Sequence, residues 1–405
     1  MNRTIGGGTG TRTRTGEGGA NLLALRSHNT ALVLDLLRGA GAGGISRLEL
    51  AERTGLTPQA VSKITARLRG EGLAAEAGRR ASTGGKPRTV LRLVPGAGHA
   101  LGVHLDRDEL RAVLVDLDGT VVAERRAPLD LGAGAETLLE GVARAAEELA
   151  AEGLAPAVPQ DAGARPPGGA LAAAPTFLGL GAALPGPLDH VRGVLHRVTG
   201  FPEWDGYPLR DALERRLGVP VVVDKDTNAA ALGLAVGGAG NEEPGGAGAG
   251  SFAYLHLGTG LGAGLVFGGG VHRGARTGAG EFGHQVVQLD GPPCTCGARG
   301  CIEALCLAAV ARGDLAEAAR VLGTGAANLA GLLDIDQVLL GGRTVAAAPE
   351  AFVQGVGAVL DARARREGGH DGAVPVRLAP GGPRGVAEGA AQLLLAPLFG
   401  RGDGG

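Results

Sequence analysis

The spacing of apolar residues near the amino terminus predicts three helices. Leucine and valine recur at helical intervals over residues 21–38. A second helix begins at Ser46, where Glu49 three residues later completes the pattern of a capping box. Gly55 ends that helix in a tight turn, and a third helix follows Thr57. Two short helices around a glycine turn are typical of a helix-turn-helix.

The segment after the third helix predicts a basic wing. After Gly72, two short strands are joined by a loop rich in arginine and lysine, which extends the motif to a winged helix-turn-helix over residues 21–95. Side chains near the start of the third helix are expected to reach base edges, and basic residues to meet phosphates. The predicted DNA contacts are Thr57, Gln59, Ser62, Lys63 and Arg67 on the helix and Arg79, Arg80, Lys86 and Arg88 on the wing. The alternative is a three-helix packing domain with a solvated basic hairpin.

Beyond a glycine hinge at residues 96–98, the pattern is that of an α/β body. Apolar and polar residues alternate over two or three strands, with an Asp-Gly hairpin turn at Asp118. Strand pairs and helices then recur twice, with glycine-rich loops at the strand ends. This repetition indicates two similar lobes around a cleft. We expect one buried strand to lead into a loop that holds Asp224, Asp226 and Asn228.

Charge divides the chain into two parts. Residues 1–95 contain 15 lysines and arginines against 6 aspartates and glutamates, a balance of +9, whereas the remainder has a balance of −11. A basic module joined to an acidic body favours polyanion binding by the amino-terminal part. Residues 1–20 lack an apolar signal-peptide core and are predicted to be disordered, and the Pro, Ala and Gly-rich segment 155–175 is predicted to be a surface loop. With no run of 18 apolar residues, we expect a cytoplasmic protein with no membrane partner.

Potential metal ligands are concentrated between residues 280 and 303. Three thiolates and one imidazole in this stretch have the composition of a tetrahedral zinc site. The proposed ligands are His284, Cys294, Cys296 and Cys301. The alternatives are a disulfide between two of these cysteines or ordinary buried thiols, and the fourth cysteine, Cys306, is expected in the core. Glu281 and Glu303 bracket the stretch and are free to face a ligand.

Three segments of the body resemble the signature of the ROK family, which groups bacterial sugar-responsive repressors with sugar kinases. They read LGTGLGAGLVFGG, AGEFGH and CTCGARGCIE. The resemblance covers nearly everything from about His99 onwards, and the winged domain in front matches the repressor branch. It implies an α/β two-lobed, actin-like ATPase (ROK/sugar-kinase) fold over residues 99–405, joined to the amino-terminal winged helix-turn-helix.

The resemblance also implies roles for individual residues. In the family, the histidine and the three cysteines hold a structural zinc ion, which here means His284, Cys294, Cys296 and Cys301. The family's sugar contacts correspond here to Asp226, Glu281, His284 and Glu303. A carboxylate can accept two hydroxyl protons, and zinc would orient the histidine ring toward the sugar.

The sequence departs from the kinases at the first phosphate loop. A kinase of this family needs an Asp-x-Gly-Gly-Thr loop, because glycine lets backbone amides close around phosphate. The corresponding segment, residues 104–109, has no glycine and gains acidic residues. The second loop, residues 258–260, is retained, and so is Asp226 at the position of the general base. Since an isolated base cannot transfer phosphate without a bound nucleotide, we expect no enzyme activity.

Two further departures concern the sugar. Lys225 stands where family members usually have asparagine, and Gly200 where a second asparagine is expected. Lys225 is interpreted either as a surface cation or partner of Asp224, or as a contact for an anionic group such as a sugar phosphate. The chain is also shorter than the family between Glu303 and the helix at 323–333.

Together these features predict a sugar- or sugar-phosphate-responsive repressor of carbohydrate genes that binds palindromic operator DNA as a homodimer or tetramer. One alternative is a sugar kinase with an appended DNA-binding domain. The other is a ligand-independent regulator whose body serves only for dimerisation.

Overall fold

The computed structural model describes residues 28–82, 85–154, 176–198, 200–237, 250–368 and 373–401. The predicted tail at 1–20, the first residues of the predicted helix at 21–38, and the predicted surface loop at 155–175 lie outside the described residues.

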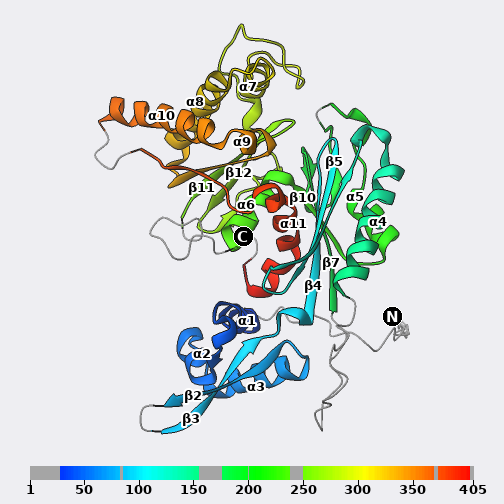
Figure 1. Cartoon of the computed structure of the whole chain (residues 1–405), viewed down its shortest axis with the longest axis vertical. Coiled ribbons are helices and arrows are strands. Elements are labelled where there is room, and N and C mark those ends of the chain that lie inside the picture. Colours follow the sequence, from blue (N-terminus) through cyan, green and yellow to red (C-terminus); the bar gives the residue numbers. More distant parts are fainter. Residues whose placement is uncertain are drawn as a thin grey trace, which may run out of the picture.

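The amino-terminal domain is a winged helix-turn-helix, as predicted (Figure 1). Its elements are α1 (His28–Gly39), η2 (Gly41–Gly43), β1 (Ile45–Ser46), α2 (Arg47–Thr54), α3 (Pro58–Gly70), β2 (Ala74–Ser82) and β3 (Gly85–Leu93). The capping box at Ser46 and Glu49 is present, and Gly55 ends α2 with a left-handed φ of 70°. The wing strands pair antiparallel, and β1 adds to the outer edge of β3. The local signals of the sequence therefore gave the correct element order.

The first lobe contains a five-stranded sheet in the order β10-β7-β4-β5-β6. Its elements are η3 (Pro95–Ala97), β4 (Gly98–Leu105), β5 (Glu109–Asp116), β6 (Val121–Pro128), η4 (Leu131–Ala133), α4 (Ala135–Gly153), β7 (Thr176–Leu184), β8 (Leu188–Asp189), β9 (Val194–Leu195), η5 (Pro202–Trp204), α5 (Leu209–Leu217) and β10 (Val221–Lys225). β4, β5 and β6 are antiparallel, whereas β7 and β10 run parallel to β4. α4 and α5 bury one face of this sheet (Figure 1).

The second lobe repeats this arrangement in the order β13-β12-β11-β14-β15. Its elements are β11 (Phe252–Leu257), β12 (Leu261–Phe267), β13 (Gly270–Val271), η6 (Phe282–His284), α7 (Ile302–Ala311), α8 (Leu315–Leu333), β14 (Gln337–Gly341), α9 (Arg343–Ala347), α10 (Pro349–Glu367) and β15 (Val376–Leu378). Three antiparallel strands are again followed by two parallel ones. The prediction of two similar α/β lobes is confirmed.

Two helices lie between the sheets. α6 (Asp226–Val236) packs along α11 (Gly385–Leu395), and α11 also covers β4 and β7 (Figure 1). Glycine permits this close approach, since a β-carbon at Gly233 would lie 2.9 Å from the Cα of Gly389. The predicted loop around Asp226 is wrong, because β10 passes directly into α6. Asp224 therefore lies in the strand, and Asn228 lies in the helix.

The end of the chain connects the body to the DNA-binding domain. α11 is preceded by η7 (Gly382–Arg384) and followed by η8 (Ala396–Phe399). η8 contacts α1 of the winged domain. Arg38 of α1 donates a hydrogen bond of 2.8 Å to the carbonyl of Asp118 and stacks over the ring of Phe399. Apolar side chains of α1, β5 and α11 belong to one buried cluster. The winged domain is thus packed against the first lobe.

No helix in the described part of the chain is long and apolar enough to cross a bilayer.

Candidate functional site

The predicted zinc ligands meet in one cluster. The Nδ1 atom of His284 lies 3.7 Å from the sulfur of Cys294, and the sulfurs of Cys296 and Cys301 are also 3.7 Å apart. All four donor atoms lie within 4.8 Å of one another. A tetrahedral zinc ion with bonds of about 2.0–2.3 Å separates its ligands by roughly 3.5–3.8 Å, so this donor set fits such an ion.

Local backbone geometry produces the cluster. η6 ends at His284, and Cys301 is the residue immediately before α7. Between the cysteines, Gly297 and Gly300 have φ angles of 94° and 66°, which favour glycine. All four cysteines are free thiols in the structure, so the disulfide interpretation is not supported. Cys306 is fully buried in α7, as expected.

The five predicted sugar contacts line one small cavity. They are Lys225, Asp226, Glu281, His284 and Glu303. The cavity has a volume of about 70 Å³ and lies where the two lobes meet, between the start of α6 and the start of α7. That volume accommodates about five water molecules, and the cavity shares Asp106 and His256 with a larger cavity between the lobes.

The charged groups of this cavity differ in how many hydrogen bonds they already make. Glu303 is 6% exposed, and its Oε2 accepts a bond of 2.8 Å from the amide of Leu261. Asp226 accepts a bond of 2.6 Å from the amide of Thr227. Each of these carboxylates keeps a second oxygen for a ligand hydroxyl. Because Nδ1 of His284 faces Cys294, its Nε2 is directed away from the metal cluster.

Lys225 is neither a surface cation nor an ion-pair partner of Asp224, the two interpretations that gave it no role in ligand binding. Its side chain is 3% exposed, so it is not a surface cation. Its Nζ donates to the carbonyl of Ala279 and, at 3.1 Å, to Glu281. Asp224 accepts from the backbone amide of Lys225 but is not the ion-pair partner of its ammonium group, because that carboxylate pairs with Arg273 at 2.7 Å. The partner of Lys225 is Glu281, which directly precedes η6 and lies 56 residues away in the sequence.

Arg107 is a cavity residue that sequence reasoning missed. It follows Asp106 in the altered phosphate loop and lines the same cavity as Asp226. Its guanidinium lies over the ring of Phe201, 5.8 Å from the centroid. The sequence signal that could have identified Arg107 was a single cation in a loop that has more acidic residues than the phosphate loop of the kinases.

An ion-pair network joins the two lobes beside this cavity. Arg343, the first residue of α9, donates to Asp106 and, at 2.6 and 2.8 Å, to both carboxylate oxygens of Asp108. Thr259 of the second lobe also donates to Asp106, at 2.9 Å. We call Asp106, Asp108, Thr259 and Arg343 the interlobe clamp. Burial raises the pKa of Asp106, but nearby His104, the Arg107 amide, Arg343 and Thr259 outweigh it and lower this pKa to about 2.

Removing the clamp is expected to loosen the two lobes. In Arg343→Gln, the buried carboxylate of Asp106 loses its cation, and we expect the free energy of unfolding to fall by about 2 kcal/mol at pH 7. We also expect a larger radius of gyration in solution scattering. Because the pKa of Asp106 lies below its ordinary 3.8, its contribution is present above pH 3.8 and is lost as the pH falls through about 2. Arg320→Gln, which breaks an exposed pair within α8, is the control. Equal scattering and stability in both variants would show that the clamp holds nothing together.

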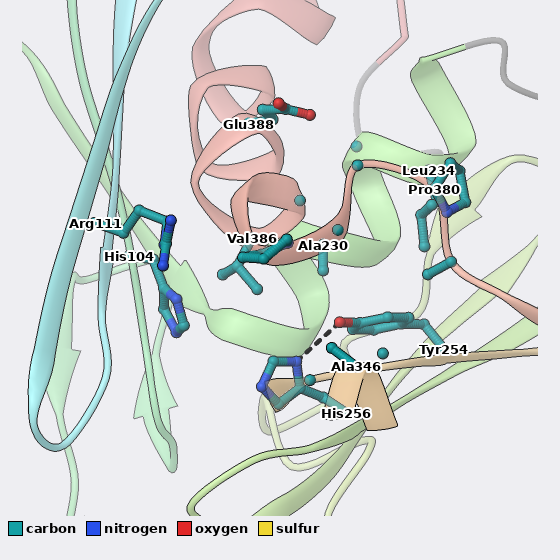
Figure 2. A pocket seen from close by; sticks show the side chains of 18 of the residues that line it. His104, Arg111, Ala230, Leu234, Tyr254, His256, Ala346, Pro380, Val386 and Glu388 are labelled. Carbon is teal, nitrogen blue, oxygen red and sulfur yellow. Dashed lines mark hydrogen bonds between the residues drawn. The ribbon is translucent and has the colours of Figure 1, made fainter. Parts of the chain in front are cut away.

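A larger cavity of about 830 Å³ lies between the lobes (Figure 2). Figure 2 shows His104 and Arg111 on one wall, Tyr254 and His256 opposite, and α11 behind. The cations in its described lining already have partners. Arg111 and Arg126 pair with Glu109 at 2.7 and 2.5 Å, Arg343 belongs to the clamp, and Arg38 donates to a carbonyl. This distribution leaves few free donors for a triphosphate.

The predicted DNA contacts on α3 are exposed. Gln59, Ser62, Lys63 and Arg67 are exposed on α3. Thr57 is exposed too, but its hydroxyl caps α3 by accepting a bond from the amide of Ala60. Arg67 also donates to Thr30 of α1 at 2.7 Å, so part of its donor capacity is used within the protein.

The wing is described in part. Arg79 and Arg88 are exposed on the paired strands β2 and β3. The side chains of Arg80 and Lys86 lie outside the described residues.

The architecture defines a winged helix-turn-helix domain attached to a two-lobed actin-like body of the sugar-kinase type. The family models that match are "ROK family" over residues 169–311 and "Winged helix-turn-helix DNA-binding" over residues 32–73. A ROK hexokinase from Thermus thermophilus is 30% identical over 72% of this chain and 96% of its own, with a TM-score of 0.54. The chain belongs to the ROK family.

Other relatives are regulators. The xylose repressor of Bacillus subtilis (strain 168) is 28% identical over 64% of this chain and 61% of its own length. A crystal structure of a ROK family transcriptional regulator, a homologue of the Escherichia coli MLC protein, covers 93% of this chain and 98% of its own with a TM-score of 0.68. At 19% identity, that match shows the fold alone. The chain spans about three fifths of the length of the curated xylose repressors it matches.

Proposed function

We propose that this protein is a transcriptional repressor of carbohydrate genes, released from its operator by a monosaccharide or a monosaccharide phosphate. The observation that carries this proposal is that a winged helix-turn-helix domain with exposed cations on α3 packs through α1 against a body with a carboxylate-lined cavity. The similarity to a xylose repressor supports it. A homodimer on a palindromic site would double the contacts that a single small winged domain can make.

A continuous helical path would carry the signal. Asp226 lines the cavity and begins α6, which packs along α11, and η8 at the end of α11 contacts α1 of the winged domain. A ligand held by Asp226 and Glu303 would stabilise one arrangement of the lobes. A difference of a few kcal/mol between two arrangements suffices to release DNA.

We assign the four-residue cluster to a structural zinc ion. Three thiolates and one imidazole complete a tetrahedral shell and leave no position for a reacting water. When bound, zinc would fix the ring of His284 and keep its Nε2 toward the sugar cavity.

A kinase is the second candidate, because the fold is shared with hexokinases and Asp226 is retained. Against it, the altered phosphate loop carries Asp106 and Asp108, and both are paired with Arg343 of the other lobe. We therefore assign no catalytic role to Asp226. Consumption of Mg-ATP in the presence of hexoses would overturn this assignment.

The DNA-binding part is tested with duplexes selected from a random-sequence pool. Lys63→Ala removes an exposed phosphate or base contact, so we expect about tenfold weaker binding and a salt dependence reduced by about one charge. Arg192→Ala removes a cation that is 81% exposed on the body and serves as the control. Equal binding by the two variants would contradict the assignment of the DNA surface.

The sensing part is tested by titrating the protein–DNA complex with monosaccharides and their phosphates in a gel-shift assay. At least one of them is expected to release the DNA. If none of these sugars alters the affinity of the protein for DNA, the proposal of sugar sensing is wrong, and the body serves for dimerisation alone.

A further inference from the structure

Arg107 differs from the other strong cation of the small cavity. Lys225 is committed to Glu281 and to the carbonyl of Ala279. Among the described residues, the guanidinium of Arg107 has no carboxylate partner. It lies over the ring of Phe201 in a cation–π contact. An arginine presents five hydrogen-bond donors in a planar arrangement, so most of the binding capacity of Arg107 is unused.

The backbone around Arg107 holds it at the cavity. Its amide donates to Asp106 at 2.8 Å, and its carbonyl accepts from the amide of Leu131 at 3.0 Å. Because Asp106 belongs to the interlobe clamp, the base of the Arg107 side chain is anchored between the lobes. Stacking over Phe201 then limits the directions that the guanidinium can take.

Two glycines leave space beside the guanidinium. A β-carbon at Gly200 would lie 3.8 Å from one terminal nitrogen of Arg107, and one at Gly260 would lie 3.6 Å from the other. Any larger side chain at these positions would compete with a ligand group for the same donors. Gly200, which replaces an expected asparagine, therefore leaves one terminal nitrogen of Arg107 without a neighbouring side chain at that position.

The carboxylates of the cavity complete the pattern. Asp106 is paired with Arg343, and Glu281 is paired with Lys225. Among the described residues, Asp226 and Glu303 have hydrogen bonds only from backbone amides and can accept further hydrogen bonds from hydroxyl groups. The cavity thus offers acceptors suited to a polyol and one unpaired cation suited to an anion.

We infer that the effector is a monosaccharide with one anionic group, a phosphate or a carboxylate, and that Arg107 binds this group. Lys225 is then a positioning residue that orients Glu281. This inference rests on the proposed sugar binding and names its ligand class. Bidentate hydrogen bonds from arginine suit both anions.

The test is calorimetric titration of the full-length, zinc-loaded protein with neutral and charged monosaccharides. The probes are xylose, glucose and N-acetylglucosamine, the 6-phosphates of the two hexoses, and glucuronate. At least one charged sugar is expected to bind tenfold or more tightly than its neutral parent, and Arg107→Gln should remove about that factor while the neutral sugar binds as before. Comparison of the 6-phosphates with glucuronate distinguishes phosphate from carboxylate.

Two variants separate the roles of the cations. Arg107→Lys keeps the charge and should retain part of the preference for the anion. Lys225→Met should weaken charged and neutral sugars alike, because it releases Glu281. Loss of the anion preference in Lys225→Met but not in Arg107→Gln would overturn the inference.

The remaining outcomes also decide the question. Equal binding of neutral and charged sugars, unchanged in Arg107→Gln, would reject the anionic effector but leave sugar sensing intact. Absence of binding by every probe, with DNA affinity also unaffected, would reject both the inference and the proposed sensing function.

Discussion

Replacing Cys296 with serine is expected to abolish zinc binding and to lower the stability of the body by about 3 kcal/mol or more. Its sulfur lies 3.7 Å from that of Cys301, so its loss breaks the tetrahedral set. Without the ion, nothing offsets the conformational entropy of the loop that wraps it, because this loop has little regular structure of its own. The measurements are zinc per chain by atomic absorption and the midpoint of thermal unfolding.

Cys306→Ala is the matched control for this change. Cys306 is buried on α7 and donates to the carbonyl of Ala318, but it does not belong to the cluster. The control should keep one zinc per chain while losing a small amount of core packing. A Cys296→Ser protein with an undiminished zinc content would show that the ligand assignment is wrong.

The second large effect is expected at Gly181, in the middle of β7. An added β-carbon there would overlap the backbone carbonyl of Ala390 in α11. Neither backbone can yield easily, because β7 lies between β4 and β10 and α11 is packed against α6. Gly181→Ala is therefore expected to cost about 3 kcal/mol or more, measured by urea unfolding.

Gly357→Ala is the matched control for Gly181→Ala, because this substitution is not expected to destabilise the protein. A β-carbon at this position on α10 meets no atom within 4 Å. The substitution should be neutral or should stabilise the helix by up to about 1 kcal/mol. If Gly181→Ala proved as well tolerated as Gly357→Ala, the close packing of α11 on the sheet would be incorrect.

Features encoded by neighbouring residues could be predicted from the sequence. The capping box of α2 and the start of α3 at Thr57 depend on contacts within three residues, and the wing is a hairpin whose paired residues lie at most 19 apart. The metal cluster is also local, since its four ligands lie within 18 residues. The resemblance to the ROK family predicted the two-lobed body and five residues that line the small cavity.

Local pattern was misleading at the junction of β10 and α6. Polar residues at 224, 226 and 228 suggested a loop, because such residues are common in turns. In the structure these residues lie at the end of β10 and in the first turn of α6, and the long-range partner among them is that of Asp224. Asp224 binds Arg273 and Asn228, and the side chain of Asp226 accepts from the first turn of α6.

The sequence by itself determined the element order, the winged helix-turn-helix, the two-lobed fold and the residues that we propose to bind metal and sugar, because short-range spacing and family motifs encode them. The tertiary structure alone decided which charges are free. Arg343 reaches Asp106 across 237 residues, and Lys225 reaches Glu281 across 56. These pairings depend on how the lobes pack, and they leave Arg107 as the unpaired arginine of the small cavity among the described residues.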